Sequence, residues 1–304
     1  MVPVLEELRQ AQPTHGMTMS MFYEYLGISR QGYYQVKKRW YIRKQMLEEI
    51  SQLVNRYRLS KDARAGSRSL YYNLGIKQLF AIGVTQFEQL MSENKWVLSQ
   101  LRVRIVTTNS VKQSWNYENL INGKVLTGIN TLVVGDLTYI NIHGVRYYLF
   151  CLTDVYSSRI VGHHISTRMR SQEALAAFNQ WVRLRGKDAL KGCIQHTDGG
   201  AQYFSAMYLM AVNNCDIVIS RANNCLENGH AEQRNGLIKN HLVPLIKNPK
   251  VNIPKEVGRL IASYNNNRKQ EKLGWLSPAE YEKSQGEKKS NDAKEMFNFE
   301  QPQR

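Results

Sequence analysis

The chain has 304 residues, enough for one large domain or for two to three smaller ones. Its 41 Lys and Arg residues against 25 Asp and Glu residues give a formal net charge of +16, which favours a polyanionic partner, nucleic acid first. No apolar run approaches the roughly 20 residues of a membrane-spanning helix and no signal peptide is apparent, so we expect a cytoplasmic protein with no membrane partner.

The cysteines do not form a recognisable framework. They are scattered, with no Cys-x-x-Cys and no paired histidine spacing, which argues against disulfides and against a zinc module. We expect buried free thiols at Cys151, Cys193, Cys215 and Cys225.

Residues 18–40 predict two short helices around a turn, a helix-turn-helix pattern. Gly27 ends the first helix, and Ser29 is placed to cap the second, over 30–40. The second helix and its continuation are basic and aromatic without an acidic residue, which is typical of a helix lying against DNA phosphates. A solvated basic face is the alternative. The expected DNA contacts are Arg30, Tyr33, Lys37, Lys38 and Arg39.

More helices are expected further along the N-terminal third. An apolar stripe predicts a separate helix over 41–57, and glycine breaks predict a second helical pair over 66–95. We therefore assign a helix-turn-helix DNA-binding region with its following helix to 1–60, and a second helical DNA-binding region to 61–100. A basic linker follows at 101–128, in which Arg102 and Arg104 are expected to contact DNA.

The pattern changes to strands after Ile129, where Val, Tyr, Leu, Ile and Phe become frequent. Three strands in a meander and then alternating helices and strands predict an α/β fold: a mixed five-stranded sheet with helices on both faces. The strands are expected at 131–140, 145–154, 159–166, 192–197 and 216–220, and the helices from 171, at 201–212 and at 226–246. This core is assigned to 129–283, and a mobile charged tail to 284–304.

Three carboxylates are candidates for chemistry. Asp136 interrupts an apolar strand, which is costly for an unpaired charge, and Asp198 ends a strand before Gly199-Gly200, where α/β sheets hold their ligands. Glu232 lies near the start of the 226–246 helix. Carboxylate oxygens are the ligands that Mg²⁺ prefers, and two such ions can support in-line phosphoryl displacement.

Several other residues near these three in the sequence are candidates for binding or structural roles. Lys239 lies two helical turns after Glu232, on nearly the same face, and is a candidate phosphate contact or else a solvated lysine. Turn and capping roles are expected for Asp154 and Asp216. His196 either orients Asp198 or is a hydrogen-bonded core histidine.

Five segments in order resemble one known family. These are Leu26 to Tyr34, Gly135 to Ile140, His196 to Tyr203, Asn228 to Glu232, and Tyr264 to Arg268 followed by Leu273 to Pro278. The chain is similar over most of its length to the DDE transposases of bacterial insertion sequences, OrfB type of the IS-three family, which have a retroviral-integrase-like catalytic core.

The resemblance implies an RNase H-like fold in which Asp136, Asp198 and Glu232 are catalytic and bind two Mg²⁺ or Mn²⁺ ions. It implies binding of terminal inverted repeats in double-stranded DNA, strand cleavage and strand transfer to target DNA. A homodimer or larger assembly on paired ends is implied, with an upstream-frame protein as a possible partner. The expected location is the bacterial cytoplasm, on the nucleoid when DNA is bound.

The chain also departs from the family's pattern. The 33 residues between Asp198 and Glu232 are slightly fewer than usual, which indicates a shortened loop, and Glu227 is the runner-up for the third carboxylate. Two other functions stay open: a catalytically inactive DNA-binding regulator derived from a transposase, and a nuclease acting on RNA in hybrids.

Overall fold

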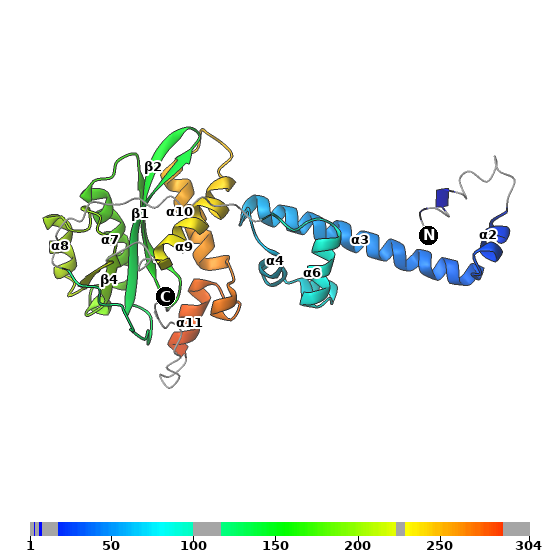
Figure 1. Ribbon diagram of the computed structural model, residues 1–304, viewed down its shortest axis with the longest axis horizontal. Coiled ribbons are helices and arrows are strands. Elements are labelled where there is room, and N and C mark those ends of the chain that lie inside the picture. The colour runs from blue at the N-terminus through cyan, green and yellow to red at the C-terminus, as the bar shows by residue number, and fades with distance from the viewer. Residues whose placement is uncertain (1–2, 4–5, 8–17, 100–116, 223–228, 288–304) are drawn as a thin grey trace, which may run out of the picture. The chain divides into compact units, whose positions relative to one another are not determined.

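The computed structural model describes residues 3, 6–7, 18–99, 117–222 and 229–287. Figure 1 shows these elements as a ribbon. The chain divides into two compact units. Residues 1–56 with 78–80 form the N-terminal unit, and residues 57–77 with 81–304 form the sheet unit. In the described part of the chain no helix is long and apolar enough to cross a membrane.

The N-terminal unit contains the predicted turn between two helices. Helix α2 (Met19–Tyr25) is capped by Thr18, and Gly27 follows it with φ +63°. The Ser29 hydroxyl accepts a hydrogen bond from the Gly32 amide at 3.0 Å, at the start of α3 (Arg30–Ser60). The break expected after residue 40 is wrong: α3 is one helix of 31 residues, because no Gly or Pro after Gly32 interrupts it.

The second helical pair is present, with one addition. Helices α4 (Ser67–Leu74) and α6 (Val84–Glu93) match the expected spans. A short helix α5 (Ile76–Phe80) lies between them, entered through Gly75 at φ +65°.

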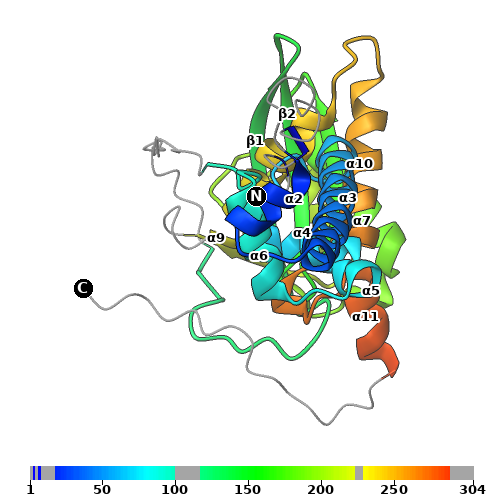
Figure 2. The ribbon, with the colours of Figure 1, turned by 90° about the vertical axis from the view of Figure 1, so that its right-hand side faces the viewer.

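The sheet has five strands in the order β3-β2-β1-β4-β5. The first three are antiparallel neighbours, whereas β4 and β5 run parallel to β1. Their bounds are β1 Leu132–Ile142, β2 Val145–Asp154, β3 Ile160–Ser166, β4 Ile194–Thr197 and β5 Val218–Arg221. His143 and Gly144, both with positive φ, make the tight turn between β1 and β2. Figure 2 shows this hairpin from the side. The mixed five-stranded sheet is as predicted.

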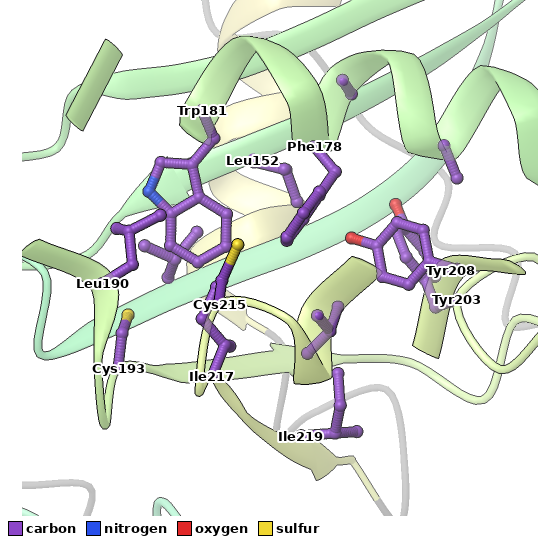
Figure 3. Packing of buried hydrophobic residues seen from close by; sticks show 14 of the residues in the cluster. Leu152, Phe178, Trp181, Leu190, Cys193, Tyr203, Tyr208, Cys215, Ile217 and Ile219 are labelled. Atoms are coloured by element: carbon purple, nitrogen blue, oxygen red, sulfur yellow. The ribbon is translucent and has the colours of Figure 1, made fainter. Parts of the chain in front are cut away.

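Helices cover both faces of the sheet, as Figure 1 shows. Helices α7 (Ser171–Arg185) and α8 (Ala206–Asn213) pack on one face. Their core includes Trp181 and Phe178 of α7 and Tyr208 of α8 (Figure 3). The α8 helix begins later than expected, because Ser205 provides its cap.

The opposite face is covered by α9 (Gly229–Leu237) and α10 (Ile253–Asn267). The helix expected over 226–246 changes character after Leu237, because a π-helical turn, Ile238–Leu242, and a 3₁₀ turn, Val243–Leu245, complete it. Pro244 cannot donate a backbone hydrogen bond, so a regular helix ends near it. The inward-facing residues predicted for this segment are buried: Ile238, Leu242 and Leu245.

Residues 117–128 belong to the sheet unit, although they were expected to be linker. Ile121 and Leu126 are buried against the sheet, and the Leu120 amide donates to the Ser220 hydroxyl at 2.9 Å. The few apolar residues of this segment neither alternate as in a strand nor recur over several turns as in a helix. This is why the sequence of the segment was interpreted as a linker.

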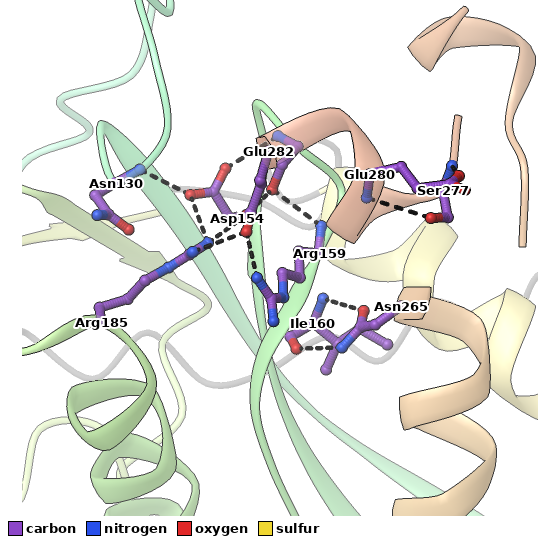
Figure 4. Close-up of polar contacts among 10 residues, drawn as sticks. Asn130, Asp154, Arg159, Ile160, Arg185, Asn265, Ser277, Glu280 and Glu282 are labelled. Atoms are coloured by element: carbon purple, nitrogen blue, oxygen red, sulfur yellow. Dashed lines mark hydrogen bonds and ion pairs between the residues drawn. The ribbon is translucent and has the colours of Figure 1, made fainter. Parts of the chain in front are cut away.

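A buried ionic network attaches the last described helix, α11 (Pro278–Glu287), to the sheet (Figure 4). Glu282 accepts hydrogen bonds from Arg185, at 2.8 Å, and from the Ser157 hydroxyl, at 2.7 Å. Burial opposes ionisation of Glu282, but these donors outweigh it and lower its pKa. Asp154 accepts from the Asn130 and Ser157 amides, in agreement with the structural role predicted for it.

Short 3₁₀ turns complete the described elements, at Asp188–Leu190 and Glu271–Leu273. The described cysteines, Cys151, Cys193 and Cys215, are free and buried, as expected, and Cys225 lies outside the described residues. Most of the predicted tail also lies outside them.

Candidate active site

The pairing of β1 with β4 places two of the candidate carboxylates side by side. The parallel ladder ends at the pair Gly135 and Thr197, so Asp136 and Asp198 come directly after it on adjacent strands. Residues at the same register of neighbouring parallel strands lie about 5 Å apart and point to the same face. On β1 this is the face of Val134, which packs with Ala231 of α9. Both carboxylates therefore lie beneath α9.

Asp136 is in an unfavourable environment for a negative charge. Burial raises the pKa of its carboxyl to about 7, and the charges of Asp198 and Glu232 contribute to the rise. The Asn235 side-chain amide donates to Asp136 Oδ2 at 2.6 Å and acts in the opposite direction. Asp136 thus combines a desolvated carboxylate with one fixed hydrogen-bond donor.

Asp198 lies in the turn that follows β4. Burial raises the pKa of its carboxyl, while a hydrogen bond from the Gly200 amide, at 3.2 Å, and the positive charge of Arg221 lower it. Gly199 has no room for a side chain without movement, because an added Cβ would lie 3.1 Å from the Arg221 guanidinium. The glycines after Asp198 therefore allow a close approach of backbone and arginine to the carboxylate.

Glu232 lies in the first turn of α9 and is exposed. It is three residues before Asn235, so the two side chains occupy one face of the helix, and Glu232 is near enough to Asp136 to influence its pKa. In the described part of the chain no three His, Cys, Asp or Glu side chains are gathered closely enough to hold a metal ion together.

Lys239 lies beside this site rather than in open solvent. Its ammonium is 5.0 Å from the centre of the Tyr139 ring, and Arg146 approaches the same ring at 5.6 Å. Burial lowers the pKa of Lys239, and the charge of Asp136 raises it. The predicted placement on the carboxylate side of the helix thus agrees with an electrostatic interaction between Lys239 and Asp136.

The basic residues expected to bind DNA differ in exposure. Arg30, Lys38 and Arg39 are exposed, whereas Lys37 is paired with Glu6 at 2.7 Å. Tyr33 is 1% exposed and packs against Tyr23 and Tyr34, so the DNA contact expected of it is incorrect. An aromatic residue beside basic ones signalled DNA contact, but in this helix it belongs to the core. Arg102, Arg104 and the runner-up Glu227 lie outside the described residues.

His196 is a core residue in this structure. It is fully buried, and its Nδ1 lies 2.8 Å from the Ser220 hydroxyl. Of the two roles considered for it, the hydrogen-bonded core histidine fits.

Sequence reasoning missed two residues that lower the pKa of the carboxylates, Asn235 by a hydrogen bond to Asp136 and Arg221 by its charge near Asp198. Asn235 follows Glu232 at helical spacing, so the i, i+3 rule could have found it. Arg221 is close to Asp198 only because β5 pairs with β4, and no local pattern reveals that neighbour.

The donor set suits a hard divalent cation. Carboxylate oxygens are the ligands of Mg²⁺, which often takes one or two of them together with water and substrate phosphate. A cation between Asp136 and Asp198 would offset the desolvation that raises the pKa of both groups and the repulsion that further raises the pKa of Asp136. The residues present therefore fit the metal that the resemblance implies.

Comparison with known proteins identifies the class. Residues 127–225 match the integrase core domain family. An IS600 protein of 31 kDa from Shigella sonnei is 27% identical over 84% of this chain and 95% of its own length. The IS629 transposase of the same organism is 31% identical over 50% of this chain and 52% of its own length. The chain is thus similar to insertion-sequence transposases, and its residues 127–225 match an integrase core domain.

Solved structures resemble this chain in fold. The integrase catalytic core domain of HTLV-2 in complex with magnesium has a TM-score of 0.44 at 21% identity, and covers 52% of this chain and 99% of its own. A chain of the simian T-cell lymphotropic virus intasome in complex with PP2A regulatory subunit B56 gamma has a TM-score of 0.49 at 16% identity, over 76% of each chain. The order of the strands, β3-β2-β1-β4-β5, with helices on both faces, is that of the RNase H-like fold.

Proposed function

We propose that this transposase binds the terminal inverted repeats of an insertion sequence and catalyses metal-dependent cleavage and transfer of DNA strands. The catalytic and metal-binding residues are Asp136, Asp198 and Glu232. The observation that carries the proposal is the placement of Asp136, within β1, and Asp198, after β4, each one residue beyond the last pair of the parallel ladder between these strands, with burial and repulsion by Asp198 raising the pKa of Asp136 to about 7. Such a pair is unfavourable unless a cation joins it.

The reaction has two displacements at phosphorus. In cleavage, a water oxygen bonds to the scissile phosphorus, the bond to the 3′ oxygen breaks, and that oxygen takes a proton. In transfer, the freed 3′ hydroxyl bonds to a phosphorus of target DNA, its proton is released, and one bridging P–O bond of the target breaks. One or two divalent cations, when bound, stabilise charge on the attacking and leaving oxygens.

The residues of the chain supply position and charge. Asn235 fixes one oxygen of Asp136 through its 2.6 Å hydrogen bond, and the Gly200 amide fixes one oxygen of Asp198. Glu232 reaches the site from α9 as the third carboxylate. Lys239, held beside Tyr139, contacts a DNA phosphate next to the scissile bond.

DNA outside the core is bound by the basic residues of the N-terminal region. Exposed Arg30, Lys38 and Arg39 contact backbone phosphates, and Arg102 and Arg104 do so from a segment outside the described residues. Two ends must be handled together, so we propose a homodimer or larger assembly on paired ends.

The test is a nicking and strand-joining assay on a labelled duplex that carries the element's ends, which are found as imperfect inverted repeats flanking the coding region. We expect both products with Mg²⁺ or Mn²⁺ and none with EDTA. The matched control is Asp136→Asn, which should bind the duplex and form neither product. Equal products from this variant would contradict the assignment.

A DNA-binding regulator without cleavage activity is the second candidate. It is favoured by one observation: Glu232 is exposed and, among the described residues, does not complete a three-carboxylate cluster. Binding of the ends with no metal-dependent product under any of these conditions would support the regulator.

A further inference from the structure

The outer half of the β1–β2 hairpin extends past the parallel part of the sheet (Figure 1). The ladder between β1 and β4 ends at Gly135, whereas β1 stays paired with β2 as far as Ile142. Since a strand rises about 3.3 Å per residue, the stretch of β1 after Asp136 reaches roughly 20 Å beyond that carboxylate. The outer hairpin, residues 137–150, is therefore a ribbon that begins at the candidate active site and leads away from it.

Tyr139 is an exposed aromatic residue on this ribbon. Its exposed fraction is 60%, although the next residue of β1, Ile140, is buried. Successive side chains of a strand point to opposite faces, so the Tyr139 ring lies on the face away from Ile140. A single exposed ring needs no special explanation. The groups around the ring therefore decide whether it has a role.

Two cations from different elements approach this ring. Lys239 Nζ, from the π-helical turn after α9, lies 5.0 Å from the ring centre. The guanidinium of Arg146, from β2, lies 5.6 Å from the same point. The face of an aromatic ring carries partial negative charge and attracts cations. Tyr139 thus holds two positive groups next to each other at the surface of the ribbon.

The hairpin has no carboxylate of its own to pair with these cations. No Asp or Glu occurs in the sequence between Asp136 and Asp154, a stretch that includes the outer parts of both strands and the turn. Arg146 is exposed, and Lys239 is influenced by the charge of Asp136. The surface around Tyr139 is therefore positive, and an anionic partner complements it.

The side chains on this surface suit a nucleic-acid strand. A guanidinium can donate two parallel hydrogen bonds to a phosphate, and an ammonium binds phosphate as a point charge. Cations beside an exposed aromatic ring are typical of surfaces that follow a phosphodiester backbone. Two cations from separate elements fit successive phosphates better than one small anion, and the formal net charge of +16 favours the same kind of partner.

The register of the hairpin gives the position of such a strand. Tyr139 is three residues after Asp136, which is about 10 Å along β1. Arg146 pairs with Asn141, which is about 17 Å along the same strand. Each strand of a DNA duplex carries one phosphate per about 3.4 Å of helix axis. The two side chains are thus placed roughly three and five phosphates from a phosphate bound at Asp136.

We propose that the outer β1–β2 hairpin binds DNA roughly three to five nucleotides from the scissile phosphate, with Arg146 as a phosphate ligand and Tyr139 as the residue that positions Arg146 and Lys239. The choice of the scissile phosphate as reference point rests on the proposed function. Lys239 then connects the two places, because it interacts with Asp136 on one side and with Tyr139 on the other. The hairpin fixes the direction in which the DNA leaves the carboxylates.

The first test measures binding of the full-length protein to a fluorescent duplex of unrelated sequence, in EDTA, over a range of salt concentrations. For Arg146→Gln we expect the slope of log affinity against log salt to fall by about 0.9, and affinity at low salt to fall about 5-fold. The control is Arg183→Gln, which removes an equal charge from an exposed position of α7. Arg183 is two residues before Arg185, which pairs with Asp154 at the end of β2 away from the hairpin turn, so this variant should change neither value.

The positioning role of Tyr139 has its own test in the same assay. Tyr139→Leu removes the ring and should lower affinity about 3-fold, whereas Tyr139→Phe keeps the ring and should bind like the parent. In a chain that already carries Arg146→Gln and Lys239→Gln, Tyr139→Leu should add nothing, because no cation remains to be positioned. An equal loss in that chain, or a loss in Tyr139→Phe as large as in Tyr139→Leu, would show that Tyr139 contacts DNA itself and would overturn its positioning role.

The second test locates the contact on the duplex that carries the element's ends. Single phosphates are replaced one at a time by neutral methylphosphonates, and affinity is measured in EDTA. The parent should lose affinity when the replaced phosphate lies roughly three to five nucleotides from the nick, and Arg146→Gln should no longer respond there. Equal responses of parent and variant at every position would contradict the placement.

Other outcomes would overturn the hairpin as a DNA site. One is an unchanged slope for Arg146→Gln in a protein whose circular dichroism and melting match the parent, and another is an equal loss for Arg183→Gln, which would show an effect of net charge alone. If Arg146→Gln weakens binding of a poly-glutamate peptide but leaves DNA binding unchanged, the hairpin takes an acidic protein segment instead. Because the first test uses unrelated DNA in EDTA, it stands apart from cleavage. A protein that never cuts the element's ends but shows the Arg146 effect would lose the proposed function and keep the hairpin as a DNA site.

Discussion

Successive side chains of α9 serve two regions of opposite charge. Glu232 and Asn235 face Asp136, in a region where carboxylates repel one another, whereas Gln233 and Arg234 face a cavity where cations do so. A helix turns about 100° per residue, so neighbours in sequence can face different environments. Like charges repel one another in both regions. One helix thus borders an acidic region on one side and a basic cavity on another.

We expect the largest effect from substituting Asp136, because this change should stop strand cleavage without weakening DNA binding. Asp136→Asn keeps the shape of the side chain but removes the negative charge, so we expect strand cleavage to fall by at least about 10³-fold. DNA affinity should stay within about twofold of the parent, since no phosphate contact is lost. Initial rates of nicking and anisotropy titrations on one duplex measure both. If the variant lost much of its DNA affinity but still cleaved DNA, Asp136 would act in DNA binding and not in catalysis.

The raised pKa of Asp136 should also make the free energy of unfolding depend on pH. The pKa of Asp136 is about 7 in the folded chain against about 3.9 in an unfolded chain, so the folded state holds the proton more tightly. The free energy of unfolding should therefore fall as pH rises from about 4 to about 7, by up to about 4 kcal/mol. Urea unfolding in EDTA at pH 5 and pH 8 tests this.

Asp136→Asn is the matched variant for that measurement. It should be more stable than the parent at pH 8 and lose much of the pH dependence, while Mg²⁺ should stabilise the parent alone. If parent and variant respond identically to pH, the raised pKa belongs to another group.

Asn235 should show an intermediate effect, because it positions Asp136 without contacting substrate. Asn235→Ala removes the 2.6 Å hydrogen bond, and loss of such a supporting contact typically costs about 10- to 100-fold in activity or metal affinity. The bond lowers the pKa of Asp136, so the acidic limb of the pH–rate profile should move to higher pH in the variant. Gln233→Ala, its exposed neighbour facing the cavity, is the control. A lower rate with an unmoved pH profile would leave Asn235 a merely structural role.

Lys239 should give the smallest change. Lys239→Gln removes one cation beside the carboxylates, and we expect about a 5-fold loss in cleavage rate at low salt that shrinks as salt is added. The Tyr139 contact should hold the neutral side chain near its original place. Measuring the rate at two salt concentrations checks this. An effect that is independent of salt would mean that Lys239 acts through packing.

Much of the sheet could be predicted from sequence because its strands are regular. The frequency of Val, Tyr, Leu, Ile and Phe in β1 and β2 was enough to indicate two neighbouring strands of a meander, which pair as a hairpin. The parallel pairing of β1 with β4 is different, since it joins segments about 60 residues apart and depends on packing that no local pattern contains. It could be expected only from the resemblance.

Some residues of the site could also be predicted from the sequence, whereas others could not. Asp136 and Asp198 could be selected because a charge in an apolar strand and a carboxylate before two glycines are unusual. Arg234 could not, because a basic residue on a helix normally points to solvent, and its burial beside Tyr264 depends on α10. Tyr33 failed for the converse reason: an aromatic residue among basic ones can equally belong to a helix core.

The π-helical turn Ile238–Leu242 is a place where an insertion or deletion would change the contacts of the residues that follow it. It accommodates one residue more than a regular helix, and deleting that residue would rotate every later side chain by about 100°. His241 would then leave Asp62, which it approaches to 2.6 Å, and its carbonyl would lose the Ala63 amide. Glu232 and Asn235 precede the turn and would stay in place. Insertions and deletions in this turn would therefore change the contacts that hold the 57–77 segment but leave Glu232 and Asn235 in place. Differences in the length of this turn between related proteins should accompany differences in those contacts.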